Sequence, residues 1–537
     1  MALIPFDTRS TRPPRALGGV LLVVAALAIA LRVMPEPRTI DDAFITFRYS
    51  RNIVEGQGFV YNPGQRTLGT TTPLYTLLMA GIGWLTGSEA YPWFALVANA
   101  LADAVTAGLL ALIAWRVAER VTLAAVIGAL WAVSPMSVTF AVGGMETSVA
   151  VLWMVAAFTA YLYRRDGWMA VFAALGVLTR IDALLWVGPL LLHHWLIFWR
   201  ARAGPGIGWL QRVPWRVWTL FAALLIPWHL FSWRYFGVLV TNSAGAKRLV
   251  YAVEDWQALA RLLQHYATPF LEQDALGVPA IVAGIVLYPG LAMIGLFYLA
   301  KRVPRLLPLA VYPWIYLAAF SVINPQIFRW YLAPPLPAYF LCILVGAWAL
   351  IDALTRSRRA TPALALLGAA WLAFSLNAWT LHPDHGPDRP APKMAWHKIE
   401  LLYQQVAEEL RAEYGVDDAT LVGAGDIGAV GYFSRARILD TVGLVTPAVT
   451  AYYPVDAALI VPGGNYAVPP QLIVDYQPDY LILMEAFVRN GLAKDARFTA
   501  RYTQEKFIPT DFYGTGMILY RLREDNPALV QSEGGAR

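Results

Sequence analysis

Long apolar runs separated by short polar segments fill most of the first 380 residues of the chain. A helix needs about 20 mainly apolar residues to cross a bilayer, and the loop charges select eleven apolar runs as spans, of which 167–179 is short. The predicted spans are residues 17–34, 92–115, 121–141, 147–163, 167–179, 183–199, 217–233, 279–300, 306–323, 330–351 and 361–380. The pattern therefore predicts a polytopic α-helical membrane protein with about 11 spans.

Basic residues are concentrated in every second loop between these spans. Loops rich in arginine and lysine stay on the cytoplasmic side of a membrane. The basic loops lie at 116–120, 164–165, 200–216, 301–305 and 356–359, and the opposite loops at 35–91, 142–146, 180–182, 234–278 and 324–329. We therefore expect a multi-pass protein of the plasma (inner) membrane with a cytoplasmic N-terminus.

The interpretation of one short apolar segment, Pro73 to Leu85, decides on which side of the membrane each later loop is predicted to lie. It is too short to span a bilayer comfortably. Counting it as a span would move every later basic loop to the outer side. We therefore interpret it as a re-entrant or interfacial helix within the first outer loop, residues 35–91.

The composition changes at about Pro383, where a proline-rich linker begins. The segment Lys393–Tyr414 has the pattern of an amphipathic helix, and TLVGAGDIGAVGYF predicts a strand, a turn and a short helix. RILDTV, PDYLILM and GTGMILYRL predict further strands. The chain thus divides into a transmembrane domain, residues 1–382, and a soluble α/β domain, residues 393–537, which we expect on the outer side.

Composition and charge exclude several other classes of protein. The chain is 58% hydrophobic and 15% charged, which is typical of membrane proteins. Its net charge of +6 lies largely in the basic loops, so we predict no nucleic-acid partner. Cys342 is the only cysteine, which excludes an internal disulfide and a cysteine-based metal site. The absence of HExxH, CxxC and Walker patterns gives zinc and nucleotide chemistry no support.

The densest polar motif is DDAFITFRYSRNIVEGQGFVYNPG, residues 41–64 in the first outer loop. Asp41 and Asp42 open a predicted helix, whose dipole and unpaired N–H groups stabilise carboxylate anions. Such a carboxylate can act as a general base or a metal ligand, or simply cap the helix. Arg48 lies two turns further on the same face, where it could orient Asp41 or hold a phosphate.

These residues carry a resemblance to a known family. An outer loop that opens with two aspartates and continues through FVYNPGQRTLGTTTPLYTLL resembles the GT-C superfamily of membrane glycosyltransferases. More narrowly, it is similar to the terminal arabinofuranosyltransferases of mycobacterial cell-wall synthesis and their bacterial relatives. GMETS, LTRIDALL, TNSAGAK and GDIGAVGYF look like further blocks of that group, so the resemblance covers most of the chain.

The resemblance implies an enzyme that takes a sugar from a polyprenyl-phosphate carrier. The sugar would be arabinofuranose or a hexose such as mannose, and the acceptor a cell-envelope glycan, lipid or protein. The role of catalytic base falls on Asp41 or Asp42, with Asp41 favoured. No resident metal or cofactor is predicted, although a divalent cation at these two aspartates stays an open alternative. Beyond donor, acceptor and membrane lipids we expect no partner, and we expect a monomer.

Further polar residues on the predicted outer side are candidates for the same site. Arg180 and Asp182 interrupt an apolar stretch, so their turn should be sunk below the outer surface, where ionisable residues usually serve a function. We expect Arg180 to bind the carrier phosphate while Asp182 positions it; the alternative is mutual neutralisation. Glu146 is expected to contact the acceptor hydroxyl, or else to be an exposed carboxylate at a helix start.

The remaining candidates lie in two later outer loops. Asn242, Lys247 and Arg248 fall near TNSAGAK, a block that the resemblance places near the lipid donor. Either cation could bind phosphate, or both could meet lipid headgroups. Arg329 and Tyr331 are candidates for donor or acceptor contact, although an arginine at a span start often extends to the membrane interface.

Two other functions compete with the glycosyltransferase. A lipid-linked sugar transporter or flippase would often carry internal repeats, and this chain shows none. A scaffold that only presents the C-terminal domain would leave the first-loop motif and Arg180 unexplained. Within the C-terminal domain, the glycine-rich GAGDIG segment most simply builds a turn. Its Asp426 is an alternative contact for an acceptor glycan.

Overall fold

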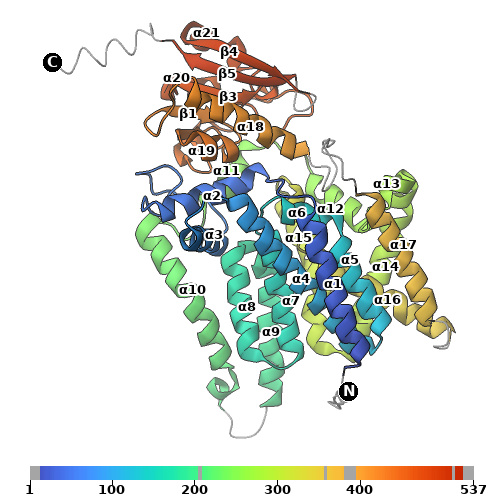
Figure 1. The fold of residues 1–537 in the computed structure, drawn as a ribbon. Helices are drawn as coiled ribbons and strands as arrows, with labels where there is room; N and C mark the ends of the chain where they lie inside the picture. The colour runs from blue at the N-terminus through green and yellow to red at the C-terminus, as the bar shows by residue number, and fades with distance from the viewer. Residues whose placement is uncertain (1–12, 203–207, 356–359, 380–394, 511–514, 524–537) are drawn as a thin grey trace.

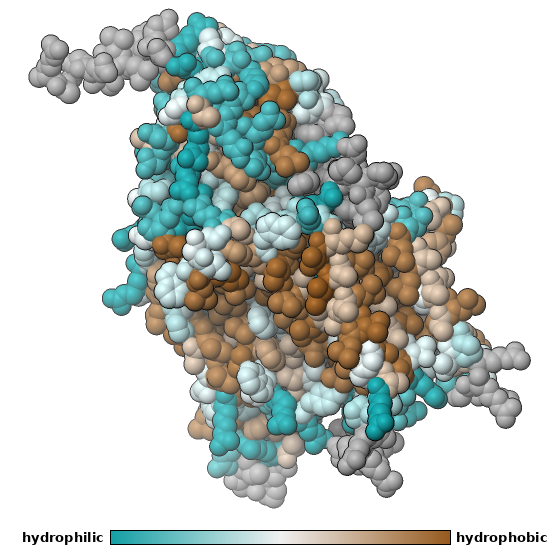
Figure 2. Space-filling view, in the orientation of Figure 1, coloured by the Kyte–Doolittle hydropathy of each residue, from teal (hydrophilic) through white to brown (hydrophobic). Residues whose placement is uncertain are grey.

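The computed structural model describes residues 13–202, 208–355, 360–379, 395–510 and 515–523. A bundle of helices forms most of the molecule, and a smaller α/β domain sits on one end of it (Figure 1). On the face shown in Figure 2, apolar side chains form a broad band across the bundle. Hydrophilic side chains gather on the α/β domain and at the opposite end, as expected for a protein embedded in a membrane.

Each predicted span coincides with a helix. These helices are α1 (Arg15–Val33), α4 (Tyr91–Ala118), α5 (Val121–Val133), α6 (Pro135–Val142), α7 (Thr147–Leu162), α8 (Asp166–Thr179), α9 (Leu184–Ala201), α10 (Trp215–Phe236), α14 (Val278–Arg302), α15 (Leu307–Ile323), α16 (Leu336–Thr355) and α17 (Ala360–Asn377). In the described part of the chain, seven helical segments are long and apolar enough to cross a membrane. The bent pair α5–α6 makes an eighth, and the apolar helices α7 and α8 are shorter. The polytopic architecture is therefore confirmed.

The break between α5 and α6 has a covalent cause. The two helices meet at an angle of 45°. Pro135 follows Ser134 directly and is the first residue of α6. Proline has no N–H to continue the ladder of α5 and disfavours a helical conformation in the residue before it. The predicted span 121–141 is thus one bent element rather than one straight helix.

Two helices of the first loop lie at the end of the bundle that carries the α/β domain. They are α2 (Asp41–Val54) and α3 (Pro73–Thr86), and they lie side by side (Figure 1). The Ser50 hydroxyl of α2 donates a hydrogen bond to the main-chain oxygen of Thr76 in α3. With only 14 residues, α3 stays at this end of the bundle, as the predicted re-entrant or interfacial helix requires. The later loop 234–278 adds α11 (Asn242–Val250), α12 (Gln257–Ala267) and α13 (Gln273–Leu276).

The C-terminal domain contains a five-stranded sheet. Its elements are α18 (Ala395–Ala412), β1 (Leu421–Ala424), α19 (Gly428–Ser434), β2 (Arg437–Asp440), α20 (Pro470–Tyr476), β3 (Tyr480–Met484), α21 (Ala496–Arg501), β4 (Tyr502–Pro509) and β5 (Gly516–Leu522). The strand order is β2-β1-β3-β5-β4. Strands β2, β1 and β3 are parallel, and β5 is antiparallel to both of its neighbours, β3 and β4. The predicted α/β class is therefore correct, and β4 is an additional strand.

A hydrogen-bonded interface joins this domain to the first loop. Both carboxylate oxygens of Asp41 accept bonds, from the N–H groups of Gly428 and Ala429, each at 2.8 Å. Arg48 is 1% exposed and donates to the main-chain oxygens of Gly431 and Ala436 at 2.6 and 2.7 Å. Further bonds connect Arg51 with Tyr432, Tyr61 with Ile427, and Asn62 with Ile438. We call this set of contacts the docking interface.

Glycine is required on the domain side of the docking interface. A Cβ atom at Gly428 would overlap the main-chain oxygen of Asp41, and one at Gly431 would overlap the hydroxyl of Tyr61. The missing side chains let α19 approach α2 closely enough for main-chain hydrogen bonds. The GDIGAVGYF segment thus does more than build a turn, because it is the surface by which the domain docks.

We predict that Gly428→Ala loosens this interface. The added methyl group meets main chain rather than a mobile side chain, so relief requires the helices to separate, at a cost of about 1–3 kcal/mol or more. Hydrogen exchange measured by mass spectrometry should show faster exchange in peptides covering 427–434 and 41–54. Gly290→Ala is the matched control, because a Cβ there meets nothing within 4 Å. Unchanged exchange in the Gly428 variant would contradict the role assigned to this glycine.

Candidate functional site

A cavity of about 170 Å³ lies at the end of the bundle that carries the first loop. We call it the first cavity. Its wall comes from α2, the loop before α3, α11, the C-terminal domain and the loops that follow α6, α8, α10 and α15. Six of the residues predicted from sequence line it: Asp42, Glu146, Arg180, Asp182, Lys247 and Tyr331. Residues from distant parts of the chain are thus brought together, most of them from loops predicted on the outer side.

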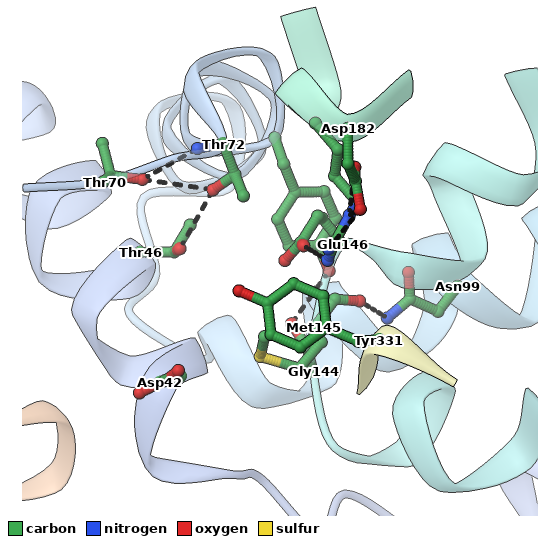
Figure 3. Close-up of polar contacts among 12 residues, drawn as sticks. Asp42, Thr46, Thr70, Thr72, Asn99, Gly144, Met145, Glu146, Asp182 and Tyr331 are labelled. Carbon is green, nitrogen blue, oxygen red and sulfur yellow. Dashed lines mark hydrogen bonds and ion pairs between the residues drawn. The ribbon is translucent and has the colours of Figure 1, made fainter. Parts of the chain in front are cut away.

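The loop that carries Glu146 is held from three sides. Asn99 of α4 donates to the main-chain oxygen of Met145 at 2.9 Å, and Tyr75 of α3 donates to that of Gly144 (Figure 3). The N–H of Ile40, directly before α2, donates to the oxygen of Gly143 at 3.0 Å. Gly144 has a φ of +75°, a conformation that strains residues with a side chain. The GMETS segment is therefore a rigid turn that directs Glu146 inward.

Arg180 is the centre of a buried charge cluster. Its Nη1 donates to Glu146 at 2.6 Å, and its Nε and Nη2 donate to the two carboxylate oxygens of Asp182 at 3.0 and 2.9 Å (Figure 3). The ring of Tyr331 lies 5.5 Å from the guanidinium carbon. The neutralisation of Arg180 by Asp182 that the sequence left open is present, and Glu146 adds a second carboxylate. The predicted solvent-exposed position for Glu146 is not found, because Glu146 is buried.

A second ion pair lies across the same cavity. Lys247 Nζ is 3.6 Å from a carboxylate oxygen of Asp42, and it lies 4.8 Å from the centre of the Phe328 ring and 5.6 Å from that of Trp330. Burial opposes the charge on Lys247, but Asp42 and Tyr331 together outweigh this effect, so the pKa of Lys247 is raised above its ordinary value. The charged ammonium is therefore favoured beside Asp42.

Hydroxyl groups form another part of the wall that sequence reasoning did not single out. The side-chain oxygen of Thr72 lies 3.4 Å from that of Thr46 and 3.2 Å from that of Thr70 (Figure 3). Ser243 donates to the main-chain oxygen of Gly69 at 2.5 Å, which joins this threonine loop to α11. The run GTTTP was visible in the sequence, but only the fold shows that its threonines line the same cavity as the charged residues.

The two neighbouring aspartates have different surroundings. Asp41 is held in the docking interface, whereas Asp42 faces the first cavity (Figure 3). Arg48 makes no bond to Asp41; besides its bonds across the interface it donates to the main-chain oxygen of Tyr61. The structure therefore places Arg48 in the docking interface, away from the cavity in which a phosphate contact was predicted.

Three other predicted residues do not line the first cavity. Asn242 begins α11, and its N–H donates to the main-chain oxygen of Leu68 at 3.2 Å. Arg248 is exposed on the same helix. Arg329 is buried beside Trp330 but is not part of the wall. In each case the adjacent residue lines the first cavity: Ser243 beside Asn242, Lys247 beside Arg248, and Trp330 beside Arg329.

A second cavity, of about 110 Å³, adjoins the first between α2 and the C-terminal domain. The two cavities share a wall made by Asp42, Ile45, Lys247, Trp330 and Leu444. Asp41, Glu400 and Asp426 bring three more carboxylates to the second cavity. Glu400 accepts a bond from the N–H of Asp41 at 2.6 Å, and Asp426 accepts one from the Tyr403 hydroxyl at 2.8 Å.

The pKa values of Asp41, Glu400 and Asp426 are raised above their ordinary range. Burial, reinforced by the nearby charge of Asp426, raises the pKa of Asp41 well above its usual value. Burial likewise raises the pKa of Glu400, with the Asp41 charge as the next contribution. For Asp426, burial raises the pKa to about 6. Sequence reasoning missed Glu400, because nothing in its amphipathic helix marks the one carboxylate that becomes buried.

The open alternative of a divalent cation at the first-loop aspartates does not fit this geometry. Both oxygens of Asp41 already accept N–H groups, and Asp42 is paired with an ammonium. Among the residues that the structure describes, no group of three or more His, Cys, Asp and Glu side chains is arranged to hold a metal ion.

The raised pKa of Asp426 predicts a pH-dependent stability. Its pKa is about 6 in the folded protein against an ordinary 3.8, so the folded state binds the extra proton between these values. The contribution of Asp426 to the free energy of unfolding therefore falls as the pH rises through about 4 to 6. Asp426→Asn cannot titrate, so it removes this pH-dependent loss of stability, and its amide oxygen can still accept the hydrogen bond from Tyr403.

The difference in apparent melting temperature between Asp426→Asn and the native protein should therefore increase from pH 4.5 to pH 7.5. For the control Glu408→Gln, at an exposed site, the curve of melting temperature against pH should stay parallel to that of the native protein. Parallel curves for Asp426→Asn would contradict the prediction.

Comparison with known proteins matches both parts of the chain. A family model described as a domain of unknown function, DUF8728, matches residues 394–525. A terminal beta-(1->2)-arabinofuranosyltransferase of Mycobacterium tuberculosis is 25% identical over 261 residues, which is 45% of this chain. That match spans only 39% of the length of the relative.

Solved structures show the same fold over nearly the whole chain. ArnT from Cupriavidus metallidurans, bound to undecaprenyl phosphate, superimposes with a TM-score of 0.54 at 13% identity, covering 95% of this chain and 98% of ArnT. Its apo state gives a TM-score of 0.56, covering 94% and 98% of the two chains at 13% identity. An oligosaccharyltransferase of Archaeoglobus fulgidus gives 0.53 at 13% identity, covering 95% and 75%. The chain is thus a membrane protein with the GT-C fold, the fold that its first loop indicated.

Proposed function

We propose that the chain is a glycosyltransferase that moves a sugar from a polyprenyl-phosphate carrier to an acceptor hydroxyl at the outer face of the plasma membrane. The observation that carries this proposal is the Asp42–Lys247 pair on the wall between two adjoining cavities. A base and a cation at the junction of two binding spaces suit a transfer between two substrates. The fold of ArnT, solved with undecaprenyl phosphate, supports a lipid-phosphate donor.

The first cavity suits the phosphate and sugar of the donor. Lys247 supplies a positive charge, and the threonine loop supplies hydroxyls that can donate to phosphate oxygens. Arg180 is paired with two carboxylates, so it contributes little net charge. Its Nη1 and Nη2 each keep a second N–H, and Glu146 and Asp182 fix the direction in which these point. Arg180 therefore positions the donor more than it attracts it.

The reaction needs one base and one stabilised leaving group. The acceptor hydroxyl attacks the anomeric carbon while the bond from that carbon to the phosphate oxygen breaks. The hydroxyl proton passes to Asp42, and the carrier leaves as a phosphate monoester with one more negative charge. The sequence favoured Asp41 for the base, but both of its oxygens are occupied by the C-terminal domain, so the contacts favour Asp42. A single displacement of this kind inverts the anomeric centre.

Lys247 links the two halves of this step electrostatically. Before reaction, its charge is shared with the Asp42 carboxylate, 3.6 Å away. When Asp42 takes the proton it becomes neutral, and the ammonium is then available to the phosphate oxygen that gains charge. Stabilisation that increases as the transition state forms is the kind that raises the rate. In this proposal Asp42 takes the proton of the acceptor, and Lys247 stabilises the phosphate that leaves.

The orientation of the protein in the membrane and the identity of the donor sugar are proposed from loop charge and sequence similarity. The cavities lie at the end of the bundle opposite the basic loops, so the positive-inside rule puts them outside the cytoplasm. The similarity to an arabinofuranosyltransferase makes arabinofuranose the first donor sugar to test, ahead of mannose.

The central test is Asp42→Asn. The amide keeps the size of the side chain but cannot accept a proton from the attacking hydroxyl. Turnover of polyprenyl-phosphate arabinofuranose should fall by about 10²–10⁴-fold, whereas donor affinity in the same detergent preparation should change little. Asp41→Asn retains one acceptor oxygen for the domain and should lose less activity. Near-normal turnover in Asp42→Asn would refute the assignment of the base, and donor binding without turnover in the native protein would favour a transporter.

Lys247→Gln tests the other half of the pair. Loss of a charged phosphate contact should weaken donor binding by about 1.5–3 kcal/mol, or roughly 10–150-fold in Kd. Arg248→Gln is the matched control, since the next residue of the same helix is exposed and outside both cavities. Donor affinity measured by equilibrium binding should separate the two variants. An equal loss in both would point to general attraction by the loop rather than a contact made by Lys247.

A further inference from the structure

The second cavity contains two buried polar atoms that the described residues leave unsatisfied. Oε2 of Glu400 and the hydroxyl of Tyr466 have no hydrogen-bond partner in the described part of the chain, and each residue is only 3% exposed. An unsatisfied buried polar group costs about 1–3 kcal/mol, and more when it is charged. Native structures rarely keep such groups without a reason, and a ligand that completes them is one.

The unsatisfied Glu400 oxygen is held in place by the rest of its side chain. Its other carboxylate oxygen, Oε1, accepts the N–H of Asp41 at 2.6 Å, so the carboxylate cannot turn away from the cavity without breaking that bond. Tyr466 is fixed by ring contacts with Tyr251 and Phe487, whose centres lie 5.9 and 4.4 Å away. Both polar atoms are therefore held ready in the wall, as preorganised binding groups are.

The chemistry of the wall defines what could bind. Burial raises the pKa of Glu400, so its carboxyl group can accept a hydrogen bond when ionised and donate one when protonated. A hydroxyl group both donates and accepts, so it can pair with this oxygen in either state. Asp426 and Asp42 add more carboxylate oxygens, which disfavours an anionic ligand. Phe328 and Trp330, whose rings stack in parallel at 4.7 Å, supply a flat apolar surface. Lys247 also lines the cavity and disfavours a cationic ligand. Hydroxyl groups on an apolar ring meet these conditions, and a neutral sugar has both.

We propose that the second cavity binds a neutral sugar residue of the acceptor, with Glu400 and Tyr466 holding its hydroxyls. The proposal rests on the proposed function and deepens it, because it makes the acceptor a carbohydrate and gives its recognition to the C-terminal domain. Asp42 lies on the wall shared with the first cavity, so a hydroxyl of a sugar bound here faces the base. Donor and acceptor thus occupy separate cavities that meet at Asp42.

Two substitutions remove the proposed contacts and spare the docking interface. Glu400→Gln keeps an oxygen for the Asp41 N–H and replaces the unsatisfied acceptor with an NH₂ group. Tyr466→Phe removes only the hydroxyl and keeps the ring contacts with Tyr251 and Phe487. Glu408→Gln is the matched control, because Glu408 lies two turns further along α18 on an exposed site. The full-length protein in detergent is the sample for all variants.

The first measurement is binding of a neutral arabinan oligosaccharide, a neutral mannan oligosaccharide and a lysine-rich peptide, by saturation-transfer NMR and calorimetry. The native protein should bind at least one oligosaccharide and not the peptide. Glu400→Gln and Tyr466→Phe should each weaken that binding by about tenfold. Binding of the peptide alone, or equal binding by all variants, would overturn the proposal.

The second measurement separates this proposal from the proposed function. In transfer assays, both variants should raise the KM for the oligosaccharide by about tenfold while donor affinity stays at the native value. Loss of donor binding together with acceptor binding would indicate a folding defect in Glu400→Gln, and Tyr466→Phe then decides the question. A native protein that binds oligosaccharide but never turns over a polyprenyl-phosphate sugar would refute the proposed function and leave the sugar site standing.

Discussion

The carboxylate of Asp41 is the contact on which the rest of the site depends. Its two oxygens accept the first N–H groups of α19, while its own N–H donates to Glu400 of α18. Successive residues on a helix point about 100° apart. Fixing Asp41 in the docking interface therefore turns the next residue, Asp42, toward Lys247 and the first cavity. The soluble domain thereby sets the orientation of the residue that faces the substrates.

Charge balance explains why these groups can be buried together. Each cation that lines the first cavity has at least one carboxylate beside it: Lys247 has Asp42, and Arg180 has Glu146 and Asp182. An isolated charge of this kind would shift its pKa or draw in water. Pairing offsets the cost of burying these charges while leaving N–H donors available to a ligand. The second cavity differs, because among the described residues Asp41, Glu400 and Asp426 have no cation beside them comparable to Arg180, and burial together with neighbouring carboxylates raises their pKa values.

Sequence patterns predicted the features that depend on neighbouring residues in the chain. The apolar runs identified the bundle, the shortness of Pro73 to Leu85 separated α3 from the spans, and the loop motifs identified Asp42, Glu146, Arg180, Asp182, Lys247 and Tyr331. Contacts between distant segments could not be read in this way. Arg48 has the spacing of a ligand-binding residue, but two of its partners are main-chain oxygens about 385 positions away. Glu400 has no distinguishing neighbours in sequence, and only tertiary packing makes it different from Glu408.

The docking interface also has a consequence for the order in which the molecule is made. Asp41 and its partner Gly428 are separated by 387 positions in the chain. At about 5–20 residues per second, ribosomal synthesis needs roughly 20–80 s to pass from one to the other. During that interval the first loop lacks the N–H groups of α19 that hold Asp41. The wall between the two cavities, which includes Leu444, is therefore completed only when the last domain arrives.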